Sequence, residues 1–99
     1  MYRLLLHPSI EKQLAKIPAA QARRLAEAMR ALRDDPRPQG CKHLTENLYR
    51  IREGEYRIVY AVFDKELAVF ICKVGRRSEK IYRDLAALLA AARGKVEGE

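Results

Sequence analysis

Residues 49–60, YRIREGEYRIVY, constrain the fold more than any other stretch of the chain. Apolar and charged side chains alternate on both sides of a glycine, which is typical of a β-hairpin with one buried face. Folding the segment about Glu53 and Gly54 pairs Ile51 with Tyr56 across the two strands. The chain is therefore expected to contain an antiparallel sheet built around this hairpin.

The same register gathers arginines on one face of the hairpin. Arg50 lies directly across from Arg57, and Arg52 lies beside them. Like charges opposite one another destabilise a sheet, and a face that only needs to be soluble would mix charges of both signs. We interpret the cluster as a functional surface, with a solvated basic face as the simpler alternative.

The rest of the chain predicts helices and further strands around the hairpin. Helical spacing of apolar residues marks three segments, and short apolar runs mark two more strands. The expected elements are a strand over 2–7, helices over 10–17 and 19–35, a loop over 35–40, the hairpin, a turn at 64–66, a strand over 67–74, and a helix over 79–93 that begins after Ser78 and stops at Gly94.

This order predicts an α+β fold. An N-terminal strand and a helical hairpin pack on one face of a small antiparallel sheet, a three-strand meander, and a C-terminal helix follows. One domain is expected over residues 1–94, with a disordered tail over 95–99. A three-residue turn at 64–66 would pair Tyr60 with Phe70 and place Lys73 across from an arginine of the hairpin.

The alternation assigns two sets of side chains to opposite faces of the sheet. The face toward the early helices carries Tyr49, Ile51, Tyr56, Ile58 and Tyr60. The opposite face, which one layer of helices leaves open, carries Arg50, Arg52, Arg57 and Lys73, with Arg76, Arg77 and Tyr82 at its edge. Guanidinium groups offer forked donors and stay charged at physiological pH, so this array is suited to binding phosphate.

The charge balance indicates anionic partners. The 99 residues carry 20 Lys and Arg against 13 Asp and Glu, a formal charge of +7, which favours nucleic acid or an acidic protein segment. Cys41 and Cys72 lie in no metal-ligand pattern, so neither a metal nor a cofactor is expected. Without a signal peptide or an apolar run of about 18 residues, a cytoplasmic protein without membrane contact is expected.

Two motifs resemble the RelE side of the RelE/ParE toxin superfamily. They are LYRIREGEYRIVYAV, residues 48–62, and FICKVGRRSEKIYR, residues 70–83. The likeness covers about residues 1–85. It implies the toxin of a type II toxin–antitoxin system, a ribosome-dependent mRNA endoribonuclease that cleaves by attack of a 2′-hydroxyl on the adjacent phosphate. It also implies an acidic cognate antitoxin, mRNA in the ribosomal A site, and a toxin–antitoxin oligomer on operator DNA.

The resemblance carries roles onto particular residues by position. Arg57, Arg77 and Tyr82 are the expected catalytic residues. The expected RNA-binding residues are Arg50 and Arg52, which the resemblance supports, together with Lys73, Arg76 and Lys80, which do not come from the resemblance. Many relatives have lysine at the first two of these positions, and arginine is a poor general base, so the identity of the base stays open. The alternatives are a ParE-like DNA gyrase inhibitor without nuclease activity and a non-catalytic nucleic-acid-binding module.

Overall fold

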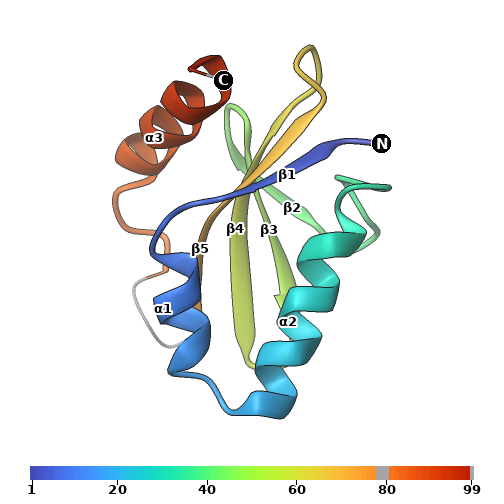
Figure 1. Ribbon diagram of the computed structural model, residues 1–99, viewed down its shortest axis with the longest axis vertical. Coiled ribbons are helices and arrows are strands. Elements are labelled where there is room, and N and C mark those ends of the chain that lie inside the picture. Colours follow the sequence, from blue (N-terminus) through green and yellow to red (C-terminus); the bar gives the residue numbers. More distant parts are fainter. Residues whose placement is uncertain (78–80, 99) are drawn as a thin grey trace.

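The computed structural model describes residues 1–77 and 81–98, which form three helices and five strands (Figure 1). In chain order the elements are β1 (Arg3–Leu6), α1 (Ile10–Ala15), α2 (Ala19–Ala31), β2 (Lys42–Thr45), β3 (Leu48–Glu53), β4 (Tyr56–Phe63), β5 (Ala68–Arg76) and α3 (Leu85–Glu97). The strands form one sheet in the order β1-β5-β4-β3-β2. The predicted α+β fold and its meander are confirmed. Within the described ranges, no helix has the length and apolar character needed to cross a membrane.

The sheet contains two strands that the pattern did not predict as members of it. β1 does not pack on the sheet but extends it, running parallel to β5 at one edge. β2 pairs antiparallel with β3, so the chain turns at residues 46–47, between Thr45 and Leu48. Glu46 adopts a φ of 46° there, a left-handed conformation that glycine more often provides. The meander therefore has four strands.

One face of the sheet is covered by α1 and α2. Leu25 and Met29 of α2, and Leu32 at its C-terminal cap, are buried against it, at the spacing of one helical face. The buried strand residues of this core are Ile51, Tyr56, Ile58, Tyr60, Val62, Val69, Ile71 and Val74. The alternation of the hairpin therefore predicted this face correctly.

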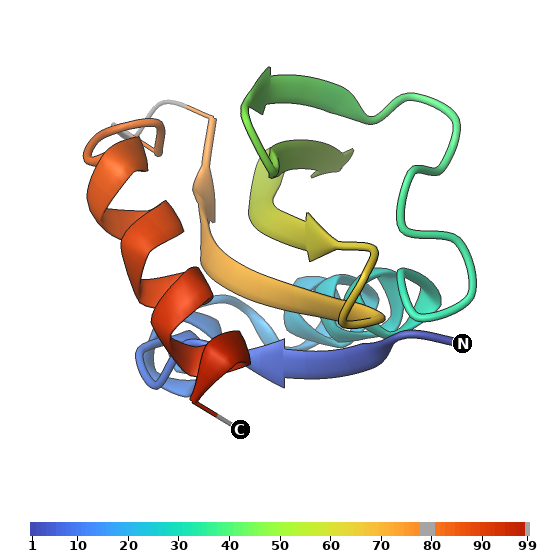
Figure 2. The ribbon, with the colours of Figure 1, turned by 90° about the horizontal axis from the view of Figure 1, so that it is seen from above.

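The opposite face is not left open, because α3 covers part of it (Figures 1 and 2). The buried residues of this second core are Leu48, Val59, Ala61, Phe63, Ala68, Phe70, Cys72, Ile81, Leu89, Ala92 and Val96. Arg93 of α3 donates to Asn47 Oδ1 (3.0 Å) and pairs with Glu46 (3.6 Å), both in the β2–β3 turn. α3 thus lies toward the β2–β3 turn. It does not cover the arginine face near Gly54, at the other end of the hairpin.

The start of α3 differs from the expectation. The helix begins at Leu85, and residues 81–84 form a turn before it. Asp84 has a φ of 58°, a left-handed conformation that a helix cannot continue through. Ser78, the expected cap, lies outside the described residues.

The end of α3 differs as well. The helix continues through Gly94 to Glu97. Val96 is only 3% exposed and extends the apolar stripe one turn beyond Ala92, so burial outweighs the low helix propensity of glycine. The expectation of a disordered tail over 95–99 is therefore wrong for residues 95–97.

The β3–β4 hairpin turns at Gly54 and Glu55, one residue later than expected. Gly54 has a φ of 60°, and glycine at the first of two turn positions is typical of the type II′ turn that matches strand twist. The pairing shifts by two residues, so every side chain keeps its face. As a result, Arg52 is the residue directly across from Arg57.

β4 and β5 pair through a bulge. Tyr60 pairs with Ile71 while Val59 pairs with Lys73, so Cys72 has no partner on β4. Bulges bend a strand and re-aim its side chains. The turn before β5 has four residues, 64–67, so the expected three-residue turn is wrong. Lys73 keeps its expected face, but it lies opposite a valine and not opposite an arginine.

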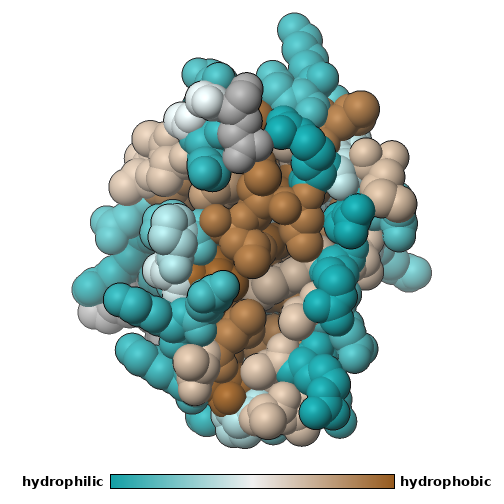
Figure 3. Space-filling model, in the orientation of Figure 1, coloured by the Kyte–Doolittle hydropathy of each residue, from teal (hydrophilic) through white to brown (hydrophobic). Residues whose placement is uncertain are grey.

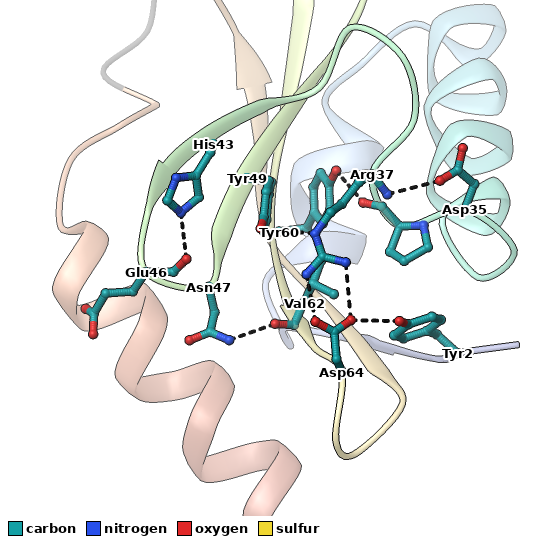
Figure 4. A network of polar contacts seen from close by, with 11 residues as sticks. Tyr2, Asp35, Arg37, His43, Glu46, Asn47, Tyr49, Tyr60, Val62 and Asp64 are labelled. Carbon is teal, nitrogen blue, oxygen red and sulfur yellow. Dashed lines mark hydrogen bonds and ion pairs between the residues drawn. The ribbon is translucent and has the colours of Figure 1, made fainter.

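A polar network joins the loop between α2 and β2 to the sheet (Figure 4). Arg37 donates two hydrogen bonds to the Asp64 carboxylate (3.2 and 2.9 Å) and one to the Tyr49 hydroxyl (3.0 Å). Tyr2 donates to the same carboxylate (2.7 Å), and buried Tyr60 donates to a carbonyl oxygen of the loop (2.7 Å). The hydrogen bonds from Arg37 and Tyr2 lower the pKa of Asp64 below its ordinary value.

An apolar band crosses the face formed by β1, α1 and α2, with hydrophilic side chains along its margins (Figure 3). Leu6, at the end of β1, is 42% exposed. Because β1 is an edge strand, this surface combines apolar side chains with an unpaired strand edge. Such a surface favours contact with another protein.

Candidate functional site

Arg57 on β4 is the most buried member of the arginine group. It is 6% exposed, and its Nη1 donates to the carbonyl oxygens of Tyr56 (3.1 Å) and Gly54 (3.4 Å). These two carbonyl oxygens use only part of the hydrogen-bonding capacity of the guanidinium, which has five N–H donors. A buried charge is costly unless a partner of opposite sign compensates it, and an anion is the partner that would complete this site.

Arg77 reaches Arg57 because the end of β5 is fixed to the hairpin turn. The main-chain N–H of Arg77 donates to the carbonyl oxygen of Glu55 (2.9 Å). A pocket of about 320 Å³ is lined by Gly54, Glu55, Arg57, Arg76 and Arg77. The structure therefore brings the two arginines that were expected to be catalytic into one pocket.

Arg52 and Arg50 extend the positive charge along β3. Arg52 is exposed across from Arg57, whereas Arg50 lies opposite Val59 and is 8% exposed. Both line a larger pocket of about 590 Å³ between β3, the end of α2 and the following loop. The sequence gives no signal for this pocket, because it exists only where β2 begins, opposite Arg50, and leaves the last residues of β3 without a neighbour.

Glu55 lines the pocket of Arg57 and Arg77, and acidic residues also line the larger pocket, but none of them pairs with the group. Within residues 1–77 and 81–98, no ion pair joins a carboxylate to Arg50, Arg52, Arg57 or Arg77. Opposed arginines without acidic partners repel one another, and a bound anion would relieve that repulsion. The group is therefore arranged as an anion-binding site.

Two expected RNA-binding residues lie differently from the expectation. Arg76 pairs with Tyr56, and its Cζ lies 5.7 Å from the centre of the Tyr56 ring, on the side of the sheet that faces α1 and α2. Lys73 is half-buried on the arginine face, opposite Val59. Arg76 thus lies against Tyr56, although it also lines the pocket of Arg57 and Arg77.

The remaining expected site residues follow β5. Lys80 lies outside the described residues. Tyr82 is in the turn before α3, is 43% exposed, and is not among the residues that line the pocket of Arg57 and Arg77. Its ring is open to solvent, where it can stack on a base.

The acid–base inventory of the smaller pocket is limited. Among its lining residues, Glu55 is the one whose side chain can accept a proton at neutral pH. The sequence placed Glu55 opposite Arg52, where it would partly neutralise the arginines, but assigned it no catalytic role, because only the type II′ turn places it beside Arg57 and Arg77. The arrangement can bind a phosphate and stabilise added negative charge, with little capacity for proton transfer.

Comparison with known proteins identifies relatives of the whole domain. Residues 4–81 match the family described as the ParE toxin of the type II toxin-antitoxin system, parDE. A Methanocaldococcus jannaschii protein assigned as toxin RelE1 is 27% identical over 77 residues, which cover 73% of this chain and 86% of that protein.

Solved structures show the same fold. A chain of the archaeal RelE–RelB complex from Pyrococcus horikoshii OT3 has a TM-score of 0.69 and 32% identity, covering 79% of this chain and 97% of that chain. The isolated Escherichia coli RelE toxin has a TM-score of 0.69 and 24% identity, covering 94% and 98%. The chain therefore belongs to the RelE/ParE superfamily of toxins from type II toxin–antitoxin systems.

Proposed function

We propose that this toxin is a ribosome-dependent mRNA endoribonuclease. The pocket that joins Arg57 and Arg77 supports this most directly, because two arginines that form no ion pair with a described carboxylate lie where a phosphate can bind. A relative that is 32% identical comes from a structure named as a RelE–RelB complex. The activity would stop translation by cutting the message in the A site.

The reaction uses the nucleophile that RNA itself carries. The 2′-oxygen forms a bond to the adjacent phosphorus, the bond from phosphorus to the 5′-oxygen breaks, and the products are a 2′,3′-cyclic phosphate and a 5′-hydroxyl. The proton of the 2′-hydroxyl goes to a base, and the leaving 5′-oxygen takes up a proton. Arg57 and Arg77 stabilise the charge that develops on the phosphorane, and one such donor is typically worth about 10²–10³ in rate.

The remaining groups position the RNA and move protons. Arg52 and Arg50 bind the RNA backbone along β3. Tyr82 stacks on a base or accepts the proton of the 2′-hydroxyl, and Glu55 is the second candidate for the base. Because these are few and weak groups, the enzyme depends on the ribosome to hold the message in a reactive geometry.

A cognate antitoxin is the second partner. The formal charge of +7 favours an acidic protein segment, and the exposed apolar band beside β1 favours protein contact. The structures of relatives named as RelE–RelB complexes support such a partner. The toxin and antitoxin together would form the oligomer that binds operator DNA.

The test measures single-turnover cleavage of a defined mRNA on purified ribosomes. Arg57→Ala and Arg77→Ala should each lower the rate by about 10²–10³, and Tyr82→Phe and Glu55→Gln identify the base. Arg23→Ala removes the same charge from the exposed side of α2 and serves as the matched control. Equal rates for Arg57→Ala and the control would contradict the assigned site.

A ParE-like gyrase inhibitor is the alternative function. The match of residues 4–81 to the family described as a ParE toxin favours it. The purified toxin would then block DNA supercoiling by gyrase and leave ribosome-bound mRNA intact. Supercoiling at the normal rate, together with cleaved mRNA, would exclude this alternative.

A further inference from the structure

The edge of β5 that faces away from β4 is paired with β1 along only part of its length. β1 pairs with residues 68–71, and the His7 N–H follows that pairing by donating to the Ile71 carbonyl oxygen (2.9 Å). Beyond Ile71, no described strand lies outside β5. This unaccompanied segment leads directly to Arg77. The position of Arg77 therefore depends not only on its hydrogen bond to Glu55 and on β4 but also on what takes the place of β1 there.

Gln13 of α1 takes that place. The Val74 N–H donates to Gln13 Oε1 (2.8 Å), and Gln13 Nε2 donates to Ser9 Oγ (2.9 Å). A main-chain N–H can only donate, so the carbonyl oxygen of the Gln13 amide must face β5. The orientation of the amide is therefore determined by its partners.

Ser9 links this amide to His7. Ser9 Oγ lies 2.7 Å from His7 Nδ1, and the Ser9 main-chain N–H donates to the same nitrogen (3.1 Å). Nδ1 therefore carries no proton in this arrangement, and the Ser9 hydroxyl donates to it. His7 thus contacts Ile71 directly through its main-chain N–H. Its side chain is linked to Val74 indirectly, first through Ser9 and then through Gln13.

These contacts span the bulge of β5. Cys72, the extra residue, lies between the two points that are held, Ile71 and Val74. A strand with a free edge and an extra residue is weakly specified in register. Val74 is fixed by Gln13 on its outer side and by β4 on its inner side, and the next residue lies across from Arg57.

We propose that Gln13 is a positioning residue of the arginine site. By fixing Val74 across the bulge, it sets the place of Arg77 beside Arg57. Ser9 orients the Gln13 amide for this purpose. The effect on cleavage rests on the proposed function, whereas the effect on the register of β5 does not.

The test compares four variants. Gln13→Leu removes both hydrogen bonds of the side chain, and Gln13→Glu keeps an acceptor for the Val74 N–H. Ser9→Ala removes only the group that orients the amide. Leu14→Ala, at a half-buried position of the same helix, lowers stability without touching these contacts and is the matched control.

The first readout is amide hydrogen exchange of Val74 and Arg77 in the free toxin, followed by NMR. Gln13→Leu should speed exchange by about tenfold relative to Leu14→Ala, the effect of one lost hydrogen bond, and Ser9→Ala should have a smaller effect. Gln13→Glu should restore the wild-type rate. Unchanged exchange in Gln13→Leu would overturn the proposal.

The second readout is cleavage of ribosome-bound mRNA. Gln13→Leu should lower kcat by roughly tenfold with KM unchanged, because a small displacement of a catalytic group is costly, and Leu14→Ala should cleave normally. Faster exchange with normal cleavage in Gln13→Leu would show a merely structural contact and overturn the proposal. If the wild type itself does not cleave, the proposed function fails, and hydrogen exchange alone decides the role of Gln13.

Discussion

At the scale of single residues, Arg57 explains most about the site. Arg57 is almost fully buried, yet its hydrogen-bond partners among the described residues are the carbonyl oxygens of Gly54 and Tyr56 and no carboxylate. Carbonyl oxygens orient the guanidinium group through hydrogen bonds but do not neutralise its positive charge. The residue is thus held in place and stays able to bind an anion.

Arg57→Lys should lose most of the activity although it keeps the charge. An ammonium is a compact point charge and cannot donate to the turn carbonyls and a phosphate in the planar geometry of a guanidinium. We expect cleavage of ribosome-bound mRNA to fall by roughly 10². Arg52→Lys is the control, because Arg52 is exposed and needs only its charge to bind a phosphate. A similar loss in both variants would contradict the distinct role of Arg57.

Asp64 predicts a pH dependence of stability. The hydrogen bonds from Arg37 and Tyr2 lower the pKa of Asp64 below its ordinary value of 3.8. The carboxylate therefore stabilises the fold above pH 4 or so, and this stabilisation is lost as the pH falls through the folded-state pKa. The Arg37 and Asp64 side chains are 40% and 57% exposed, so its size is at most about 1 kcal/mol.

Urea unfolding of the wild type and Asp64→Asn over a range of pH checks this dependence. The two proteins should differ at neutral pH and converge in acid. Asp34→Asn, an exposed aspartate without an ion pair among the described residues, should follow the wild type throughout. A difference between Asp64→Asn and the wild type that persists unchanged into strong acid would contradict the role of the ionised carboxylate.

At the scale of elements, two local departures from regular pairing build the site. The type II′ turn places Glu55 so that its carbonyl oxygen accepts from Arg77, and the bulge at Cys72 sets the register that follows it on β5. Without the bulge, the residues after Cys72 would turn to the other face of the sheet. The pocket around Arg57 therefore depends on both irregularities.

Two glycine substitutions should change stability in opposite directions. Gly54 has a φ of 60° with open space around its missing Cβ, so Gly54→Ala should destabilise the fold by about 1 kcal/mol through backbone strain alone. Gly94 lies within α3, also in open space, so Gly94→Ala should stabilise the fold by about 0.5–1 kcal/mol. Urea unfolding of both variants measures this. Changes of the same sign would contradict the turn geometry or the helical state of Gly94.

The sequence predicted which face of the sheet a side chain occupies better than it predicted which residues pair across neighbouring strands. Alternation assigned Ile51 and Arg52 to opposite faces correctly, because a shift by two residues leaves the faces of a strand unchanged. It could not predict which arginine opposes Arg57, since turn type decided that. The bulge at Cys72 and the pairing of Val74 with Gln13 depend on contacts between distant parts of the chain and have no local signal.

At the scale of the whole molecule, the residues that form the main core and the residues of the candidate site lie on opposite faces of the sheet. One face is buried under α1 and α2. The other is divided between α3, which packs toward the β2–β3 turn, and the arginine group near the hairpin turn. The positive charge of this group thus lies beside a rigid strand pair and not on a loop, which suits a site that must hold a phosphate in place.

The charge of this face predicts how RNA affinity responds to salt. Binding of a short single-stranded RNA should weaken with salt, and each lost phosphate contact should lower the slope of log K against log salt by about 0.7. Arg50→Ala and Arg52→Ala should each produce that change in fluorescence anisotropy titrations. Arg76→Ala should change the slope less, because its side chain lies against Tyr56. Equal slopes in all three variants would contradict the assignment of this face to RNA.

The central claim is that the toxin cleaves mRNA only with the help of the ribosome. The most direct measurement maps new 5′ ends on a defined mRNA in a reconstituted translation system, with ribosomes present and absent, and determines the chemistry of the ends. We expect cuts that require ribosomes, leave 2′,3′-cyclic phosphate and 5′-hydroxyl ends, and disappear in Arg57→Ala. An intact message in the presence of ribosomes and folded toxin would contradict the account, and the arginine group would then belong to a surface that binds without cleaving.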